Sequence, residues 1–152
     1  MAKIQSNDRF GFNSYGDHSW YCKCKLWVRK GASLTIGDNV GMNGVMIYAS
    51  NRVEIQNNVK IGGGTRISDS NHHSLSHIER RSTATDNCKS AQIIIEQDVF
   101  IGANCIIGKG VTIGARSIVA AGSVVVKSIP ADNIAGGNPC KVFKSTINEH
   151  PD

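Results

Sequence analysis

A six-residue hydrophobic period runs through residues 95–130 and constrains the fold of this chain more than any other feature. In register, its hexads are IEQDVF, IGANCI, IGKGVT, IGARSI, VAAGSV and VVKSIP, each opened by an aliphatic residue. The fifth position holds small or β-branched residues until Ile129. This period matches neither the 3.6 residues of an α-helix nor the alternation of a plain strand. It predicts a solenoid whose hexads each form one short strand and one bend, with a glycine-rich sandwich as the alternative.

Three such hexads are expected to close one triangular coil, which gives an all-β fold of about five coils. The opening residues would point into a core too narrow for rings, in keeping with an aromatic content of only 6%. Gly102, Gly108 and Gly114 are expected at bends, because glycine tolerates a left-handed backbone. Residues 1–152 are predicted to form a single domain.

The period is interrupted once. After ISDSNH (67–72) the next opening residue is due at position 73, but the pattern resumes only at Ile95. We therefore expect residues 73–94 to be extruded from the coil as a loop. An insertion of this length in a regular solenoid is commonly functional.

The two ends of the chain are predicted to cover the open ends of the solenoid. Residues 1–30 form the predicted N-terminal cap, with Trp20, Tyr21 and Trp27 over the core. Residues 131–152 form the predicted C-terminal cap and tail.

Composition excludes several classes of protein. The five cysteines are an odd number, which argues against a disulfide framework, and the spacing of Cys22 and Cys24 does not suit a zinc site. No metal is expected. No signal peptide or transmembrane segment is evident, so the prediction is a cytoplasmic protein. The net charge is +5, but no basic run is interleaved with aromatic residues that could stack on bases. This argues against nucleic-acid binding.

Two further stretches add to the hexads. They are GGGTRISDSNHHSLSHIERR (62–81) and AAGSVVVKSIPADNIAGGNPCKVFK (120–144). With the repeats, they make the chain resemble the hexapeptide-repeat acyltransferases, specifically the branch of maltose, galactoside and polysaccharide O-acetyltransferases. The resemblance covers about residues 26–144.

The resemblance implies a left-handed parallel β-helix that assembles as a homotrimer. It implies acetyl-CoA as co-substrate, lying in grooves between subunits, with the extruded loop of one subunit reaching its neighbour. The expected activity is transfer of an acetyl group to a hydroxyl of a sugar or of a cell-surface polysaccharide precursor. The helical N-terminal segment of the maltose and galactoside enzymes looks absent from residues 1–25, which favours the polysaccharide acceptor.

The family's histidine turn aligns with residues 69–75 and places the catalytic base at His73, with His72 and His77 as weaker alternatives. Imidazole is suited to remove a hydroxyl proton near neutral pH. Asp69 or Asn71 is expected to orient this imidazole or to contact the acceptor. The resemblance also implies an oxyanion donor among the backbone amides near Gly102 and Ala103.

The resemblance also supplies two sets of binding residues. Those expected to face the acceptor are Asn43, His72, Arg80 and Phe100. Those expected to bind the coenzyme are Ala103 and Ala121, along the pantetheine arm, and Lys127, Lys141 and Lys144, at the phosphates. Phe100, Val126 and Ser74 depart from the family's usual Trp, Thr and Pro.

Three alternatives remain open at this stage. A non-catalytic β-helix scaffold would need neither the histidine turn nor the lysine-rich ending. A γ-class carbonic anhydrase would need three histidines converging on zinc, whereas His72, His73 and His77 are neighbours in one insertion. A different acyl group, such as succinyl or formyl, is the third alternative.

Overall fold

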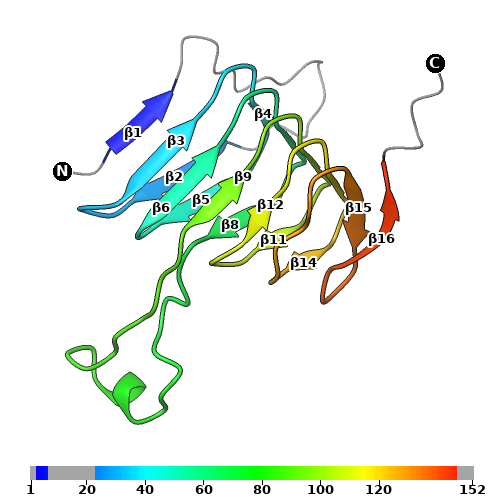
Figure 1. Cartoon of the computed structure of the whole chain (residues 1–152). Helices are drawn as coiled ribbons and strands as arrows, with labels where there is room; N and C mark the ends of the chain where they lie inside the picture. The colour runs from blue at the N-terminus through cyan, green and yellow to red at the C-terminus, as the bar shows by residue number, and fades with distance from the viewer. Residues whose placement is uncertain (1–2, 7–22, 147–152) are drawn as a thin grey trace, which may run out of the picture.

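The computed structural model describes residues 3–6 and 23–146, and the side chains from residue 23 onward. These residues form three β-sheets that make the walls of a three-sided column (Figure 1). From β2 to β14, each new strand lies in the next wall, and strands within a wall pair in parallel. The predicted caps at Trp20 and Tyr21, and the terminal residues 147–152, lie outside the described residues.

The strands of each wall follow one another up the column. Sheet A contains β1 (Lys3–Ser6), β3 (Ser33–Ile36), β6 (Arg52–Ile55), β9 (Ile93–Ile95) and β12 (Thr112–Ile113). Sheet B contains β4 (Gly41–Met42), β7 (Lys60–Ile61), β10 (Phe100–Ile101), β13 (Ile118–Val119), β15 (Asn133–Gly136) and β16 (Lys141–Ser145). Sheet C contains β2 (Lys25–Val28), β5 (Met46–Ala49), β8 (Arg66–Ser68), β11 (Ile106–Ile107) and β14 (Val124–Val125).

The column winds as a left-handed parallel β-helix, which confirms the predicted fold class (Figure 1). This hand is opposite to that of nearly all crossovers between parallel strands. Residues with positive φ recur at the bends and give the chain its tight corners. They are Asn39, Asn58, Asp98, Asn104, Arg116 and Asp132, together with Gly64, Gly110 and Gly122.

Aliphatic ladders fill the interior. In sheet A, Ile36, Ile55, Ile95 and Ile113 stack in direct register on successive coils. The six hexad openers from Ile95 to Val125 are all 0% exposed. Burying one such side chain contributes about 1.5–3 kcal/mol. These ladders therefore carry much of the stability of the column.

The glycines that follow the openers act differently from our expectation. Gly102 and Gly114 do not have positive φ. A Cβ on Gly102 would instead lie 2.5 Å from the Ala121 nitrogen, and one on Gly114 would lie 2.2 Å from the Ala131 nitrogen. These glycines are needed because the next coil passes directly over them.

The extruded loop leaves sheet C after β8 and returns to sheet A at β9. Because Ile93 already pairs with Val53, the last two residues of the predicted loop, Ile93 and Ile94, belong to the strand β9. Antiparallel contacts between Ser70 and Ser90, and between Asn71 and Lys89, join the two arms into a stalk. The 3₁₀ helix η1 (Glu79–Arg81) lies in the projecting part, away from the column (Figure 1).

The predicted caps need correction where they are described. Trp27 belongs to β2 and pairs with Tyr48 in sheet C, and its side chain is 68% exposed on the outer face of that sheet. It does not cover the core. At the other end, β15 continues sheet B in parallel, and β16 then folds back antiparallel on it. Within the described residues, no helix is long and apolar enough to cross a membrane.

Candidate active site

His73 lies in the loop and is paired with a carboxylate that the sequence did not point to. Its Nδ1 lies 2.6 Å from Oδ2 of Asp86, while Oδ1 of Asp86 accepts the Ser74 backbone N–H at 2.6 Å. The hydrogen bond from the His73 ring, together with that from Ser74, lowers the pKa of Asp86 from its ordinary value of 3.8. An ionised carboxylate can only accept, so Nδ1 carries the proton and Nε2 is left as the basic nitrogen.

Asp86 lies thirteen residues after His73, which is why local motif reading missed it. The sequence offers one signal for it: Glu79 and Asp86 are the only acidic residues in 73–94, so few carboxylates of the loop could pair with His73.

Asp69, one of the two residues expected to orient the imidazole or to contact the acceptor, forms its hydrogen bonds elsewhere. It is buried, and its oxygens accept hydrogen bonds from the Ser50 amide at 2.8 Å, the Ser50 hydroxyl at 3.1 Å and the Asn51 amide at 2.7 Å. These bonds tie the base of the stalk to the preceding coil. Asn71, the other candidate, is held in the stalk by its backbone N–H, which donates to the Lys89 carbonyl.

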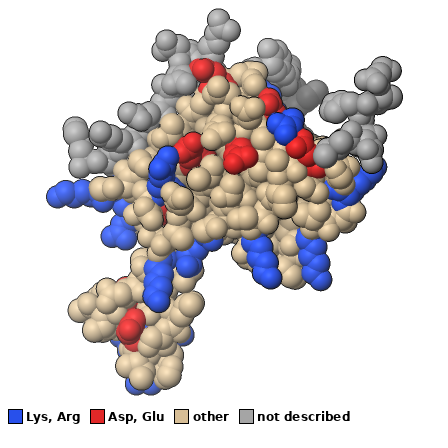
Figure 2. Space-filling model, in the orientation of Figure 1, with Lys and Arg blue, Asp and Glu red and all other residues tan. Residues whose placement is uncertain are grey.

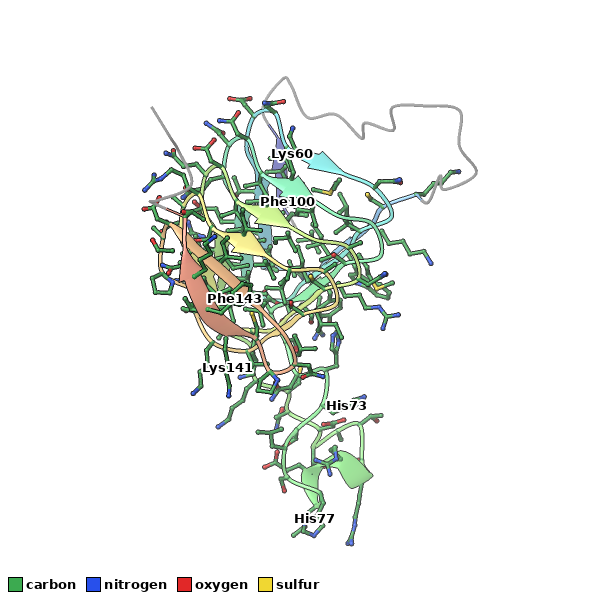
Figure 3. The ribbon with its side chains drawn as sticks, turned by 90° about the vertical axis from the view of Figure 1, so that its right-hand side faces the viewer. Lys60, His73, His77, Phe100, Lys141 and Phe143 are labelled. Atoms are coloured by element: carbon green, nitrogen blue, oxygen red, sulfur yellow. The ribbon has the colours of Figure 1, made fainter. Side chains whose placement is uncertain are left out.

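His72 faces a different direction from His73. It adopts a φ of 65°, its Nε2 lies 2.9 Å from the Ser68 hydroxyl, and its ring lies 4.4 Å from the Tyr48 ring. It therefore packs on the outer side of sheet C. Figure 3 shows His77 farther down the loop than His73. The three histidines do not converge on one point, as a zinc site would require.

Arg80 is engaged within the loop. Its Nη1 donates to the Ser74 carbonyl at 2.6 Å, and the Ser74 hydroxyl donates to the Glu79 carboxylate. Ser74 is buried at the centre of these contacts. Arg80 thus braces the segment that carries His73, and Ser74 explains why this loop does without the family's proline.

A cavity of about 410 Å³ lies on the outer side of sheet B, where the chain turns toward sheet C. We call this corner the B–C edge. Two residues expected to face the acceptor, Asn43 and Phe100, both line the cavity, and Phe100 is 49% exposed. The other lining residues are Gly41, Met42, Lys60, Ile61, Gly62 and Gly63. The volume is in the range of small-molecule sites.

Ala103 and Ala121, the predicted pantetheine contacts, continue the same edge on successive coils. The backbone N–H of Asn104 donates to the Gly63 carbonyl at 2.9 Å, and the backbone N–H of Gly122 donates to the Ala103 carbonyl at 2.8 Å. The structure therefore places two of the four acceptor candidates, Asn43 and Phe100, near the pantetheine candidates, whereas His72 and Arg80 lie elsewhere.

The predicted phosphate-binding lysines are more scattered. Lys127 follows β14 at the corner between sheets C and A, which we call the C–A edge, so it lies across sheet C from Ala121. Lys141 and Lys144 lie on β16. Basic side chains project from the lower side of the column in Figure 2.

The loop also starts from the C–A edge, whereas the cavity lies at the B–C edge. Figure 3 shows His73 on the loop, below the column, and Phe100 high on the column wall. Within one chain, the candidate base and the candidate binding cavity do not meet. Among the described residues, no three His, Cys, Asp or Glu side chains are grouped to hold a metal ion.

Comparison with known proteins identifies the repeats. Residues 92–127 match the family model described as the hexapeptide repeat of succinyl-transferase. A tetrahydropyridine-dicarboxylate N-acetyltransferase of Clostridium perfringens is 52% identical over 59 residues, which cover 39% of this chain and 25% of that enzyme. The chain thus spans about a quarter of the length of such relatives.

Two other proteins match most of the chain. The galactoside O-acetyltransferase of Escherichia coli K12 is 33% identical over 150 residues, covering 98% of this chain and 71% of the relative. A hexapeptide-repeat acetyltransferase of Vibrio cholerae, solved with acetyl coenzyme A, superposes with a TM-score of 0.73 at 36% identity, covering 82% of this chain and 66% of that one. The chain belongs to the hexapeptide-repeat acyltransferases, in the branch that contains the galactoside O-acetyltransferase.

Proposed function

We propose that this protein transfers the acetyl group of acetyl-CoA to a hydroxyl of a sugar or of a cell-surface polysaccharide precursor. The observation that carries the proposal is that Asn43 and Phe100 line one cavity, directly below the Ala103–Ala121 column. An acceptor in the cavity and a pantetheine arm on the column would bring hydroxyl and thioester together. The galactoside O-acetyltransferase relative and the neighbour solved with acetyl coenzyme A support this pairing.

We propose further that the site is completed in a homotrimer. A closed ring of three subunits uses two different surfaces at each interface, so the loop from one C–A edge can face the next subunit's B–C edge. Such an arrangement would bring His73 to a cavity that it does not reach within its own chain. Exposed apolar side chains on the outer face of sheet C, Trp27, Met46 and Ile106, support the presence of a covering surface.

In the proposed reaction, Nε2 of His73 removes the proton of the acceptor hydroxyl while its oxygen attacks the thioester carbonyl. Asp86 stabilises the resulting imidazolium through Nδ1. Collapse of the tetrahedral intermediate breaks the carbon–sulfur bond, and the departing thiolate takes the proton back from the imidazolium. Coenzyme A and the acetyl ester are the products.

The intermediate needs a donor for its oxyanion. The Gly102 amide already donates to the Val119 carbonyl at 2.8 Å, so Ala103 is the remaining candidate of the predicted pair. We assign the coenzyme's phosphates to Lys141 and Lys144, with Lys127 at the C–A edge contributed by a neighbouring subunit, because charge-assisted contacts of this kind suit phosphate oxygens.

A thiol-release assay with acetyl-CoA and a panel of sugar acceptors tests this function. Replacing His73 with Ala should reduce turnover about 10²–10⁴-fold, the usual contribution of a general base. Acetyl-CoA binding measured by calorimetry should be unchanged in the same variant, because His73 lies away from Ala103 and Ala121, the proposed pantetheine contacts.

Two results would count against the proposal. Wild-type turnover in the His73→Ala variant would remove His73 as the base. If the unaltered protein fails to bind acetyl-CoA in the calorimeter, the scaffold alternative would be favoured instead.

A further inference from the structure

Lys60 is a cavity residue that the sequence did not single out. It begins β7, and it pairs in register with Phe100 on one side and Gly41 on the other. Phe100 precedes the opener Ile101 just as Lys60 precedes Ile61, so the two side chains occupy equivalent positions on successive coils. Figure 3 shows both residues on the upper part of the column.

The Lys60 side chain is held in place. Its Nζ donates to the Asn39 carbonyl at 2.9 Å and lies 3.4 Å from Oδ1 of the same residue. Its stem passes over Gly41, where an added Cβ would lie 3.1 Å from Cδ. Lys60 therefore lines the cavity, and neutral oxygens of Asn39, which is not itself a lining residue, hold the ammonium at the sheet A side.

Among the described residues, no acidic side chain forms an ion pair with Lys60. Its two hydrogen-bond acceptors belong to an asparagine. No acidic residue lines the cavity. An ammonium has three N–H donors, so at least one is available to a ligand.

We propose, building on the function above, that the acceptor is an acidic sugar, and that Lys60 binds its carboxylate or phosphate group. Phe100, the neighbouring side chain on the same face of sheet B, provides the apolar surface against which the sugar ring lies. A cavity with apolar walls and one fixed polar group selects its ligand by placing that group. Lys60 would thereby decide which sugars present a hydroxyl to the thioester.

Lys60 could equally bind a phosphate group of the coenzyme. Binding of the acidic sugar and binding of the coenzyme are therefore measured separately. We suggest binding measurements by saturation-transfer NMR on matched probes: methyl glucuronide against methyl glucoside, and glucose 6-phosphate against glucose. The variant Lys60→Met keeps the stem over Gly41 and removes the charge. Lys60→Arg keeps the charge, and Lys30→Met removes an exposed lysine at the C–A edge as the matched control.

The proposal predicts that the wild type binds an acidic probe more tightly than its neutral counterpart. Lys60→Met should weaken binding of the acidic probe about fivefold, the upper range for a partly exposed charge pair, and added salt should reduce the difference. Lys60→Arg should restore most of the preference. Lys30→Met should leave it unchanged.

The acidic-acceptor proposal is overturned if neither acidic probe binds better than its neutral partner, or if Lys60→Met weakens acetyl-CoA binding instead. Acetyl transfer to neutral sugars alone would also defeat it while leaving the proposed transferase function intact. Absence of any acetyl-CoA binding would defeat the transferase function itself, so the two failures are distinguishable.

Discussion

At the scale of single residues, the central contact joins His73 and Asp86. The imidazole is 69% exposed on its side chain, whereas the Asp86 side chain is only 14% exposed and also anchors the Ser74 amide. The less mobile partner is therefore the carboxylate, and it sets the direction of the ring. Asp86 acts as a positioning residue in this account, because it reaches the substrate only through His73.

Replacing Asp86 with Asn tests this role. An amide oxygen can still accept the Ser74 N–H, but it cannot stabilise the imidazolium charge. We expect kcat to fall about tenfold or more, within the 10²–10⁴ that the base contributes, with the KM for acetyl-CoA unchanged. Asp98→Asn is the matched control, since asparagine also tolerates the φ of 59° at that position.

One part of the pH dependence of wild-type kcat follows from the lowered pKa of Asp86. A carboxyl whose pKa is lowered stays ionised above its ordinary value, and its contribution is lost only as pH falls through the lowered pKa. The ionisation of Asp86 itself should therefore contribute no change in wild-type kcat above about pH 5. A kcat of the Asp86→Asn variant equal to that of wild type would show that Asp86 does not position the ring.

The sequence predicted some residues of the site for physical reasons and missed others. Asn43, Phe100, Ala103 and Ala121 sit in the repeats, where the hexad register determines which edge or face each one occupies. Asp86 sits in the loop, where no period relates sequence distance to spatial distance. Asp69 belongs to the histidine turn that the family resemblance aligns, but its oxygens accept hydrogen bonds from Ser50 and Asn51.

At the scale of elements, the bends determine how closely the coils stack. The hexad period predicted the strands and their order, because each short strand is specified by one buried opener. It did not reveal why glycine follows the opener. The reason is the approach of the next coil, which joins residues 17 positions apart for Gly114 and Ala131 and 19 apart for Gly102 and Ala121.

Gly102→Ala is the direct test of this stacking. The added methyl would lie 2.5 Å from the Ala121 nitrogen and 2.7 Å from its Cα, and these backbone atoms cannot move without displacing the coil. We expect a loss of about 1–3 kcal/mol in the free energy of unfolding, measured by urea at fixed protein concentration.

Gly108→Ala serves as the control, because it occupies the same hexad position in the following repeat. A Cβ there meets only the Val125 carbonyl oxygen at 3.3 Å and a Val126 methyl at 3.8 Å. Its loss of stability should be clearly smaller. Equal losses for the two variants would mean that coil stacking does not require the glycine at 102.

At the scale of the whole molecule, the candidate site residues lie at two different edges of the column. The stalk leaves from the C–A edge, and the cavity and the alanine column lie on the B–C edge. The hexad register already indicates this separation, because the period is interrupted after the hexad of β8 in sheet C and resumes in sheet A. The separation makes the assembly part of the proposed mechanism.

Mixed assemblies provide the most direct test of this claim. One inactive variant, His73→Ala, keeps the B–C edge, and a second, Ala121→Trp, keeps the loop but fills the path of the pantetheine arm. Equal amounts refolded together should regain about a quarter of the wild-type acetyl transfer, because every closed ring of three that contains both variants has one intact site. Mixtures that remain as inactive as either variant alone, despite demonstrated co-assembly, would contradict a site shared between subunits.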